Sequence, residues 1–333
     1  MRGKQTKLRY SFTGRLVDSR QDGLFICSVW ELASMKKVLF ALLYLLGVTR
    51  LAAWCHRRRV VILCYHGVTE QPGNSADNAK GLHVNHLRFA AHLDFLQRNY
   101  NIVSLSDYLI ARNQGRSLGQ YSVVLTFDDG FRNFLTVAAP LLAARKLPAT
   151  VFLITDKASQ EDGSPRPSTW TPEDDGRYLS WSEARKLKED YGFEFGSHTC
   201  SHSPLLGLSA ADTDRELLHS FNKLVTHLAV DKPTLSYPKG EYSNMLAEDA
   251  RKLGYACAVT TDRGQNELEH DLFTLGRTLI GNNDDQASFA VRVSGVRWWL
   301  VSLFRRSGRQ HPPRPQRIGQ KVPAGEPGLQ LGE

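Results

Sequence analysis

The sequence lacks the cysteine pattern of a disulfide-rich or thiolate-metal protein. Its five cysteines are an odd number, lie far apart and include no CxxC pair (Cys27, Cys55, Cys64, Cys200 and Cys257). Disulfide frameworks and structural zinc sites both need paired cysteines at characteristic spacings. We therefore interpret the cysteines as small apolar side chains in a core.

The sequence also offers no comfortable membrane span, which would need about 20 apolar residues. Residues 38–48 are an unbroken apolar run that follows two lysines, and Arg50 interrupts it before the arginines at 57–59. A signal-peptide core, an uncleaved anchor and a helix lying in the lipid interface all fit this pattern. Since no small-x-small cleavage pattern follows, we favour an uncleaved, membrane-associating segment over 35–59. Positive charge on both flanks leaves the membrane face undetermined.

Acidic residues are scarce at both ends of the chain. The net charge of +8 divides into +9 for residues 1–59, −7 for 60–290 and +6 for 291–333. Nucleic-acid binding needs a basic surface, which an acidic middle does not supply. We therefore expect no nucleic-acid partner, and we expect the basic ends to favour phospholipid and a location at the membrane of the cell envelope.

Composition divides the rest of the chain into four parts. Because Met35 opens a start-like Met-Lys-Lys pattern, we expect residues 1–34 to be an extension outside the fold. Residues 60–290 hold the globular domain. Tryptophan and arginine over 291–306 suit an amphipathic helix, either at a lipid interface or packed on the domain. Residues 307–333, rich in proline, glycine and glutamine, read as a disordered tail.

The globular part alternates strand-like and helix-like segments. Helical spacing of apolar residues appears over 86–98 and over 210–229, the second with Ser209 and Asp212 in capping positions. This alternation predicts an α/β fold with a parallel sheet, and it fits a wound sheet and a closed barrel equally well. In both, functional residues lie at the C-terminal ends of strands. The expected strands are 60–65, 123–127, 150–154, 193–195, 235–237 and 255–259.

Two carboxylates follow the predicted strand 123–127. Asp128 and Asp129 sit in a Thr-Phe-Asp-Asp-Gly sequence, and adjacent carboxylates repel unless a cation stabilises them. A divalent metal could bind one and leave the other as a base. The alternative is an ordinary turn that ends the strand.

Two histidines follow the predicted strand 193–195. His198 and His202 are spaced i and i+4, which would place them on one face of a helical turn, where they can converge on an ion. With one aspartate they would leave an open position for water, as catalytic zinc sites do. A third motif, Tyr-Pro-Lys-Gly at 237–240, forms a rigid turn whose backbone N–H groups could stabilise an oxyanion. Surface histidines and a plain turn are the alternatives.

Together and in this order, these motifs resemble the polysaccharide deacetylase family, the NodB-homology domain of carbohydrate esterase family four. The resemblance extends over roughly residues 60–280, and the segment Ile62–Val68 is similar to the membrane-associated exopolysaccharide branch. It implies a distorted (β/α) barrel that removes N-acetyl or O-acetyl groups from a cell-envelope polysaccharide or exopolysaccharide. It also implies a divalent metal, with zinc expected and cobalt or nickel possible.

The resemblance carries roles to individual residues. Asp128 would be the general base, and Asp129, His198 and His202 would be the metal ligands. The backbone N–H of Lys239 would help to hold the oxyanion.

Two departures from the family pattern leave roles open. Ser236 stands where the third motif has an arginine that orients the base, so Arg277 is a candidate for that task, unless it is an ordinary surface arginine. The late motif with a general-acid histidine is absent. His66 and His270 are the candidates for the acid.

Two other functions stay open, the first because the late histidine is missing and the second because the same metal site could act on another substrate. One is a catalytically weak or silent module that binds glycans. The other is a deacylase of a non-carbohydrate N-acyl compound.

Overall fold

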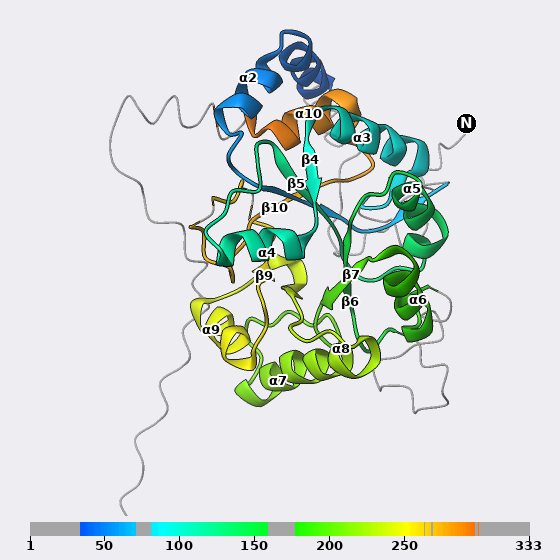
Figure 1. Cartoon of the computed structure of the whole chain (residues 1–333), viewed down its shortest axis with the longest axis vertical. Coiled ribbons are helices and arrows are strands. Elements are labelled where there is room, and N and C mark those ends of the chain that lie inside the picture. Colours follow the sequence, from blue (N-terminus) through cyan, green and yellow to red (C-terminus); the bar gives the residue numbers. More distant parts are fainter. Residues whose placement is uncertain are drawn as a thin grey trace, which may run out of the picture.

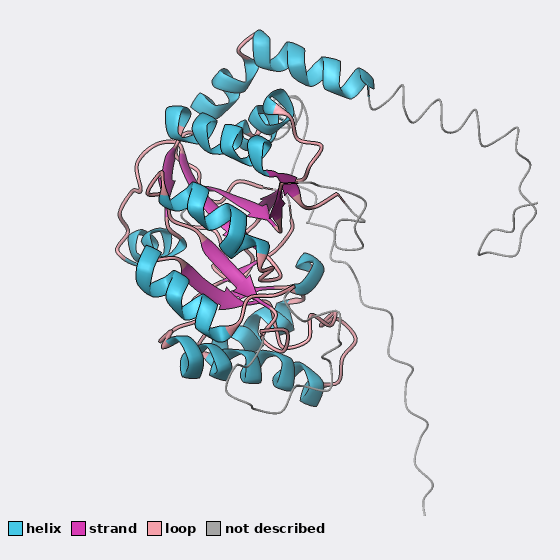
Figure 2. Ribbon diagram, turned by 90° about the vertical axis from the view of Figure 1, so that its right-hand side faces the viewer, coloured by secondary structure: helices cyan, strands magenta, loops and turns pink. Residues whose placement is uncertain are grey.

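Eight short strands form one parallel sheet that curves nearly into a barrel (Figure 2). The computed structural model describes residues 34–70, 81–158, 177–262, 264–267, 269–296 and 299. The strand order is β10–β1–β5–β6–β7–β8–β9, with β4 paired to the first half of β5. The strands are β1 Val61–Tyr65, β4 Asn101–Val103, β5 Ser122–Phe127, β6 Thr150–Leu153, β7 Glu194–Ser197, β8 Leu235–Ser236, β9 Ala258–Val259 and β10 Arg277–Leu279.

A short connection nearly closes this sheet. Val259 of β9 forms a parallel bridge with Leu275, and Arg277, two residues further on, opens β10, which pairs with β1. The sheet therefore continues from its last strand back toward its first. This arrangement confirms the expected distorted (β/α) barrel and decides the choice that the sequence pattern left open.

Helices cover the outside of the barrel (Figure 1). A separate two-stranded pair, β2 Val68–Thr69 with β3 Val84–Asn85, precedes the first of the domain's long helices. The predicted helix 86–98 is α3, and the predicted helix 210–229 is the continuous run α7–η4–α8, in which η4 is a π-helical turn. The helices are Ser34–Leu45, α2 Val48–Cys55, α3 His86–Asn99, α4 Leu105–Asn113, η2 Phe134–Ala138, α5 Ala139–Ala143, α6 Trp181–Tyr191, α7 Ala210–Asp214, η4 Arg215–His219, α8 Ser220–Leu228, η5 Pro238–Gly240, α9 Asn244–Leu253 and α10 Gln286–Ser294.

Alternation along the strands separates two cores. Leu63 of β1 and Leu125 of β5 belong to the large outer core against the helices, whereas Ile62 and Val124 belong to a smaller core with Phe152. Successive strand residues point to opposite faces, so even-numbered residues of β1 and β5 point inward. Residues that continue this parity beyond the strands enter the mouth of the barrel.

The structure does not divide at the domain boundary that the sequence predicted near residue 290. Helix α10 crosses the expected boundary between 290 and 291, and its Val291 lies in a small core with Ala52 of α2. Part of each basic end is thus packed on the domain. Residues 1–33 and 300–333, which include most of the expected extension and the whole expected tail, lie outside the described residues.

Candidate functional site

Two adjacent carboxylates leave the end of β5 toward different partners. Asp128, 2% exposed, continues the inward parity of the strand. Asp129 and Gly130 both take left-handed backbone angles, each with φ of 70°, which turns the chain sharply. A Cβ on Gly130 would lie 2.6 Å from the side chain of Leu153, so glycine is required here. Asp129 consequently faces the loop that follows β7.

Arg277, which opens β10, contacts Asp128 across the intervening strand β1. The guanidinium is fully buried and donates to both carboxylate oxygens, Nη1 to Oδ1 at 2.7 Å and Nη2 to Oδ2 at 2.6 Å. It also donates to the carbonyl of Thr260 and to the hydroxyls of Thr126 and Ser236. This burial excludes the alternative of an ordinary surface arginine. A bidentate pair of this kind fixes the orientation of the carboxylate.

Both members of this pair are ionised at neutral pH. Burial alone would disfavour the charge on Asp128, but Arg277 and His198 together hold the pKa of its carboxyl below its usual range. Burial also opposes the charge of Arg277, and Asp128 outweighs it, so the pKa of the guanidinium is raised. The barrel interior therefore contains a compensated charge pair rather than a neutral acid.

Two further groups donate to the same carboxylate. The thiol of Cys64 lies 3.4 Å from Oδ2 of Asp128, and the hydroxyl of Ser236 lies 3.3 Å from it. Burial raises the pKa of the thiol well above its ordinary value, so the thiol keeps its proton. Cys64 is buried, as expected of the cysteines and unlike the exposed Cys55, and it is a hydrogen-bond donor to Asp128 as well as an apolar filler.

The histidine motif does not form the helical turn that its spacing predicts. Residues after β7 form a loop in which Thr199 and His202 both have left-handed backbone angles, φ 66° and φ 65°. The two histidines converge because the chain folds back, with their ring centroids 4.7 Å apart. The i and i+4 spacing predicted the convergence, but its helical explanation was wrong.

A buried glutamate sets the path of this loop. Oε2 of Glu216, from the π-helical turn η4, accepts the backbone N–H groups of Cys200 and Ser201, each at 2.9 Å. Its other oxygen accepts the hydroxyl of Ser201. The loop wraps around the carboxylate, and this contact replaces the hydrogen bonds that a helical turn would have made.

Three side chains converge beside Asp128. Nε2 of His198 lies 3.4 Å from Oδ1 of Asp129, and Nε2 of His202 lies 3.7 Å from the same oxygen. Nδ1 of His198 lies 2.7 Å from the carbonyl oxygen of Ser236, to which it donates. Burial lowers the pKa of His198 to about 3, although Asp128 raises it, so the ring is neutral at pH 7. Its Nε2 therefore carries a lone pair directed at Asp129.

The chemistry of this set suits a divalent cation. The ligand atoms of Asp129, His198 and His202 all lie within 4.8 Å of one another. Two ligands at about 2.1 Å from a tetrahedral metal are about 3.4 Å apart, which is close to the two separations above. A carbonyl that holds Nδ1 of a histidine is the usual support for a ligand that binds through Nε2. The residues present thus fit the expected metal.

Lys239 lies in the turn that follows β8. Its backbone takes left-handed angles, φ 57° and ψ 5°, and its carbonyl accepts the hydroxyl of Thr261 at 3.0 Å. A Cβ on the next residue, Gly240, would lie 2.1 Å from that hydroxyl, so the turn is packed tightly. Lys239 is three residues beyond Ser236, whose carbonyl holds His198.

The two candidate acids have different surroundings. A ring nitrogen of His66 lies within 4.8 Å of the ligand atoms of Cys64 and Asp128, and burial lowers the pKa of His66 to about 4. Its Nδ1 is buried without a hydrogen-bond partner among the described residues. His270, in contrast, has Nε2 within 3.0 Å of the carbonyl of Thr274 in a local turn. The structure therefore brings His66, and not His270, to Asp128.

Sequence reasoning missed Cys64, Glu216 and the contact made by Ser236. The register could have indicated Cys64, because it pairs with Thr126, two residues before Asp128. Ser236 was noted only as the replacement for an arginine. Nothing local to Glu216 indicated its role, since it lies in the polar part of a predicted helix.

Comparison with known proteins identifies the domain. Residues 115–258 match the family model described as Polysaccharide deacetylase. The Bacillus subtilis protein YxkH is 24% identical over 241 residues, which are 72% of this chain and 77% of its own length. The match to the family model lies between His66 and Arg277 and includes neither.

One further relative is named for an activity, and one solved structure shares the fold. The poly-β-1,6-N-acetyl-D-glucosamine N-deacetylase of Escherichia coli is 24% identical over 273 residues, 73% of this chain but only 39% of the relative. The structure of the Streptococcus pyogenes deacetylase PplD in complex with acetate superimposes with a TM-score of 0.61 at 25% identity. It covers 71% of this chain and 99% of PplD.

Proposed function

Because this chain is a polysaccharide deacetylase, we propose that it is a metal-dependent hydrolase that removes N-acetyl groups from an N-acetylglucosamine polymer of the cell envelope or an exopolysaccharide. The E. coli relative, named for that activity on poly-β-1,6-N-acetyl-D-glucosamine, supports the substrate class. The observation that carries the mechanism is the Asp128–Arg277 pair beside three converging metal-ligand atoms. Removal of O-acetyl groups remains the alternative within the same chemistry.

We propose Asp129, His198 and His202 as the ligands of the metal. Zinc suits one carboxylate and two imidazoles, and cobalt or nickel suit them too. When bound, the cation supplies Lewis-acid activation of the acetyl carbonyl and of a water molecule. Neutral His198, held by the carbonyl of Ser236, presents the lone pair that such binding needs.

Asp128 is proposed as the base that takes the proton of the attacking water. Arg277 keeps the carboxylate ionised and points it in one direction, and Cys64 and Ser236 add donors to Oδ2. A carboxylate with a lowered pKa is a weak base, so Asp128 does not keep the proton and the proton moves on toward the leaving amine. As the water oxygen bonds to the acetyl carbon and the C–N bond breaks, the amine leaves with that proton.

His66 is proposed as the group that gives the proton to the amine. It lies next to Asp128, which leaves a short path for the proton from the base to the leaving group. The backbone N–H of Lys239 is proposed as the donor that holds the developing oxyanion. The tight turn at Gly240 fixes its position.

Acetate release from N-acetylglucosamine oligomers tests this proposal. Asp128→Asn keeps the shape of the side chain but removes the base, so we expect the rate to fall by roughly 10² to 10⁴-fold. Asp107→Asn, a remote capping aspartate in α4, is the matched control and should keep the parent rate. A chelator should abolish activity, and zinc, cobalt or nickel should restore it.

Other outcomes would contradict the proposal. Activity that survives both Asp128→Asn and the chelator would exclude this mechanism. Tight binding of the oligomers without turnover would indicate a silent glycan-binding module. Turnover confined to small N-acyl compounds would change the substrate class.

A further inference from the structure

The chain enters its domain through a bent pair of helices. The helix Ser34–Leu45 and α2 meet at an angle of 70° across the turn at Leu46 and Gly47. Within the described residues, no single helix is long and apolar enough to span a membrane, but this pair passes the same test when taken together. We refer to residues 34–55 as the N-terminal hairpin.

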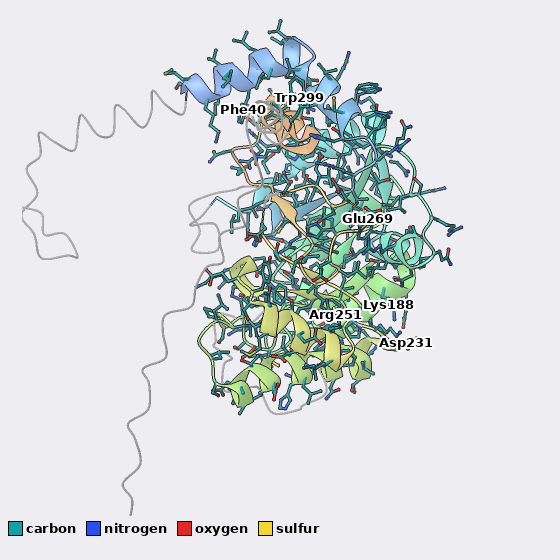
Figure 3. The ribbon with its side chains drawn as sticks, turned by 90° about the vertical axis from the view of Figure 1, so that its left-hand side faces the viewer. Phe40, Lys188, Asp231, Arg251, Glu269 and Trp299 are labelled. Carbon is teal, nitrogen blue, oxygen red and sulfur yellow. The ribbon has the colours of Figure 1, made fainter. Side chains whose placement is uncertain are left out.

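One face of the hairpin is fixed to the domain. Phe40, Leu43 and Val48 pack around a small core that α10 and the residues after it complete with Val291 and Trp299. Figure 3 shows Phe40 and Trp299 together at the end of the molecule that carries the hairpin. Arg251 and Asp231 lie at the opposite end. The hairpin is therefore held by side-chain packing, and leaving the domain would expose that core to water.

The opposite face of the hairpin is apolar and exposed. Eight of the fifteen large exposed apolar residues among those described lie in the hairpin, and Met35, Val38, Leu39 and Leu42 recur at the spacing that puts them on one face of its first helix. Patches of this kind mark interaction surfaces. We call the eight the outer apolar face: Met35, Val38, Leu39, Leu42, Leu45, Leu46, Leu51 and Trp54, with exposed fractions from 49% to 77%.

The segment that carries this face is itself basic. Residues 34–59 contain six Lys or Arg and no Asp or Glu. Arg59 pairs with Glu267. The guanidinium of Arg57 lies 4.7 Å from the ring of Trp54. Exposed leucines bordered by cations and a tryptophan are the composition of helices that lie in the interface of anionic membranes.

The bend between the helices and their packing on the domain favour a helix pair that lies in the plane of the membrane interface. They disfavour a pair that spans the membrane. A spanning arrangement would have to straighten the hairpin and bury the charged side chain of Arg50 in lipid, which is unfavourable. We propose that the N-terminal hairpin is an in-plane anchor on an anionic phospholipid bilayer. The outer apolar face enters the interface, and the cations contact the headgroups.

This orientation has a consequence for the active site. The hairpin lies at one end of the molecule's long axis (Figure 1), and only five residues, 56–60, separate α2 from the start of β1. Asp128 lies beside the opposite, C-terminal end of β1, because its backbone N–H donates to the carbonyl of Tyr65. The proposed anchor is therefore connected to the N-terminal end of β1, and the catalytic residue Asp128 lies at the other end of that strand.

Vesicle binding by the full chain tests the anchor. We expect binding to vesicles of phosphatidylcholine with phosphatidylglycerol, and weaker binding to phosphatidylcholine alone. The double variant Leu39→Asp, Leu42→Asp removes two buried-in-lipid side chains, so its binding constant should fall by roughly a hundredfold or more. Leu87→Asp, at a more exposed leucine of α3 outside the hairpin, is the control and should bind like the parent.

Charge and depth are tested separately. Lys36→Gln with Lys37→Gln should weaken binding to the anionic vesicles by about fivefold for each lysine and leave binding to phosphatidylcholine unchanged. On vesicles, the fluorescence emission of Trp54 should shift to the blue, and quenchers placed near the headgroups should reduce it. The Trp54→Phe variant gives the emission of the other tryptophans, which is subtracted. All variants should keep the parent rate of acetate release from soluble oligomers, which shows that they fold.

Three results would overturn the anchor. The first is equal vesicle binding by the Leu39→Asp, Leu42→Asp variant. The second is quenching of Trp54 only by labels at the bilayer centre, which would indicate a span. The third is a dimer that the leucine variants dissociate, with no vesicle binding by the parent, which would assign the outer apolar face to a second copy. None of these results depends on deacetylase activity.

Discussion

Asp128 has an unusual number of donors for a side chain proposed as a base. Arg277, Ser236 and Cys64 all donate to it, and each stabilises the carboxylate rather than the acid. This arrangement lowers basicity, but it fixes direction. Orientation of the base toward the attacking water offsets part of the rate that its low affinity for the proton costs.

The Asp128–Arg277 pair leads to a prediction at the residue scale. Arg277→Met removes one partner and leaves a buried, uncompensated carboxylate, which typically costs about 3–5 kcal/mol of unfolding free energy. We expect denaturant titration to show that loss, together with loss of acetate release. The pKa of Asp128 should rise, because burial would then act without the guanidinium.

The double variant Arg277→Met, Asp128→Asn is the control for this prediction. It removes both charges, so it should recover much of the stability and none of the activity. If the double variant is no more stable than Arg277→Met, the pair does not hold the charge balance of the barrel.

At the scale of elements, the π-helical turn η4 connects a helix to the histidine loop. The pattern over 210–229 predicts one helix, and the structure has one, with an extra residue accommodated over Arg215–His219. Single π turns inside helices often occur at functional sites. Here the turn places Glu216 beneath the loop that carries His202.

Glu216→Gln is the prediction for this element. The amide keeps one acceptor oxygen, but it loses the charge that strengthens the bonds to two backbone N–H groups. Supporting contacts of this kind are worth roughly 10- to 100-fold in metal affinity. We expect calorimetric zinc titration to show a loss in that range.

A second glutamate that accepts backbone N–H groups or caps a helix provides the control for Glu216→Gln. Glu183 caps α6 and lies outside the histidine loop, so Glu183→Gln should leave zinc affinity unchanged. Equal zinc affinity for the parent and Glu216→Gln would show that the loop holds its shape without this carboxylate.

At the scale of the whole molecule, the fold depends on histidines that are buried without charge. His92 of α3 is fully buried and stacks on Phe289 of α10, with ring centroids 3.9 Å apart. Its ring nitrogens lie 3.3 Å from the hydroxyl of Tyr65 and 2.9 Å from the carbonyl of Asp284. A neutral imidazole satisfies both contacts by donating to the carbonyl and accepting from the hydroxyl.

This environment predicts acid sensitivity. Burial lowers the pKa of His92 to about 4, against about 6.5 in the unfolded chain. Between these values the unfolded state binds more protons, so the free energy of unfolding falls as the pH is lowered from about 6.5 to about 4. The contribution of His92 to this fall is about 3 kcal/mol.

Denaturant titrations across that pH range check the prediction. His92→Gln retains a donor for the carbonyl of Asp284 but does not titrate, so its stability should depend less steeply on pH than that of the parent. His66 and His198 also have lowered pKa values and contribute to both curves. Parallel curves for the parent and His92→Gln would exclude His92 as a source of the acid sensitivity.

The sequence by itself determined the features that local chemistry controls. Continuous apolar, β-branched runs predicted the buried strands, because a strand covered on both faces has no polar side. The aspartate pair and the two histidines predicted where polar groups would gather, because parallel strands end at one edge of the sheet. These signals need only neighbours in the chain.

Only the tertiary structure decided which distant groups meet. Arg277 lies 149 residues from Asp128, and Ser236 lies 108 residues from it. Arg277 reaches Asp128 because β10 pairs with β1 and β1 pairs with β5, and Ser236 of β8 reaches the same carboxylate because the sheet curves nearly into a barrel. No local pattern encodes either arrangement. The packing of the N-terminal hairpin on α10 is decided in the same way, by two apolar surfaces from opposite ends of the chain that bury each other.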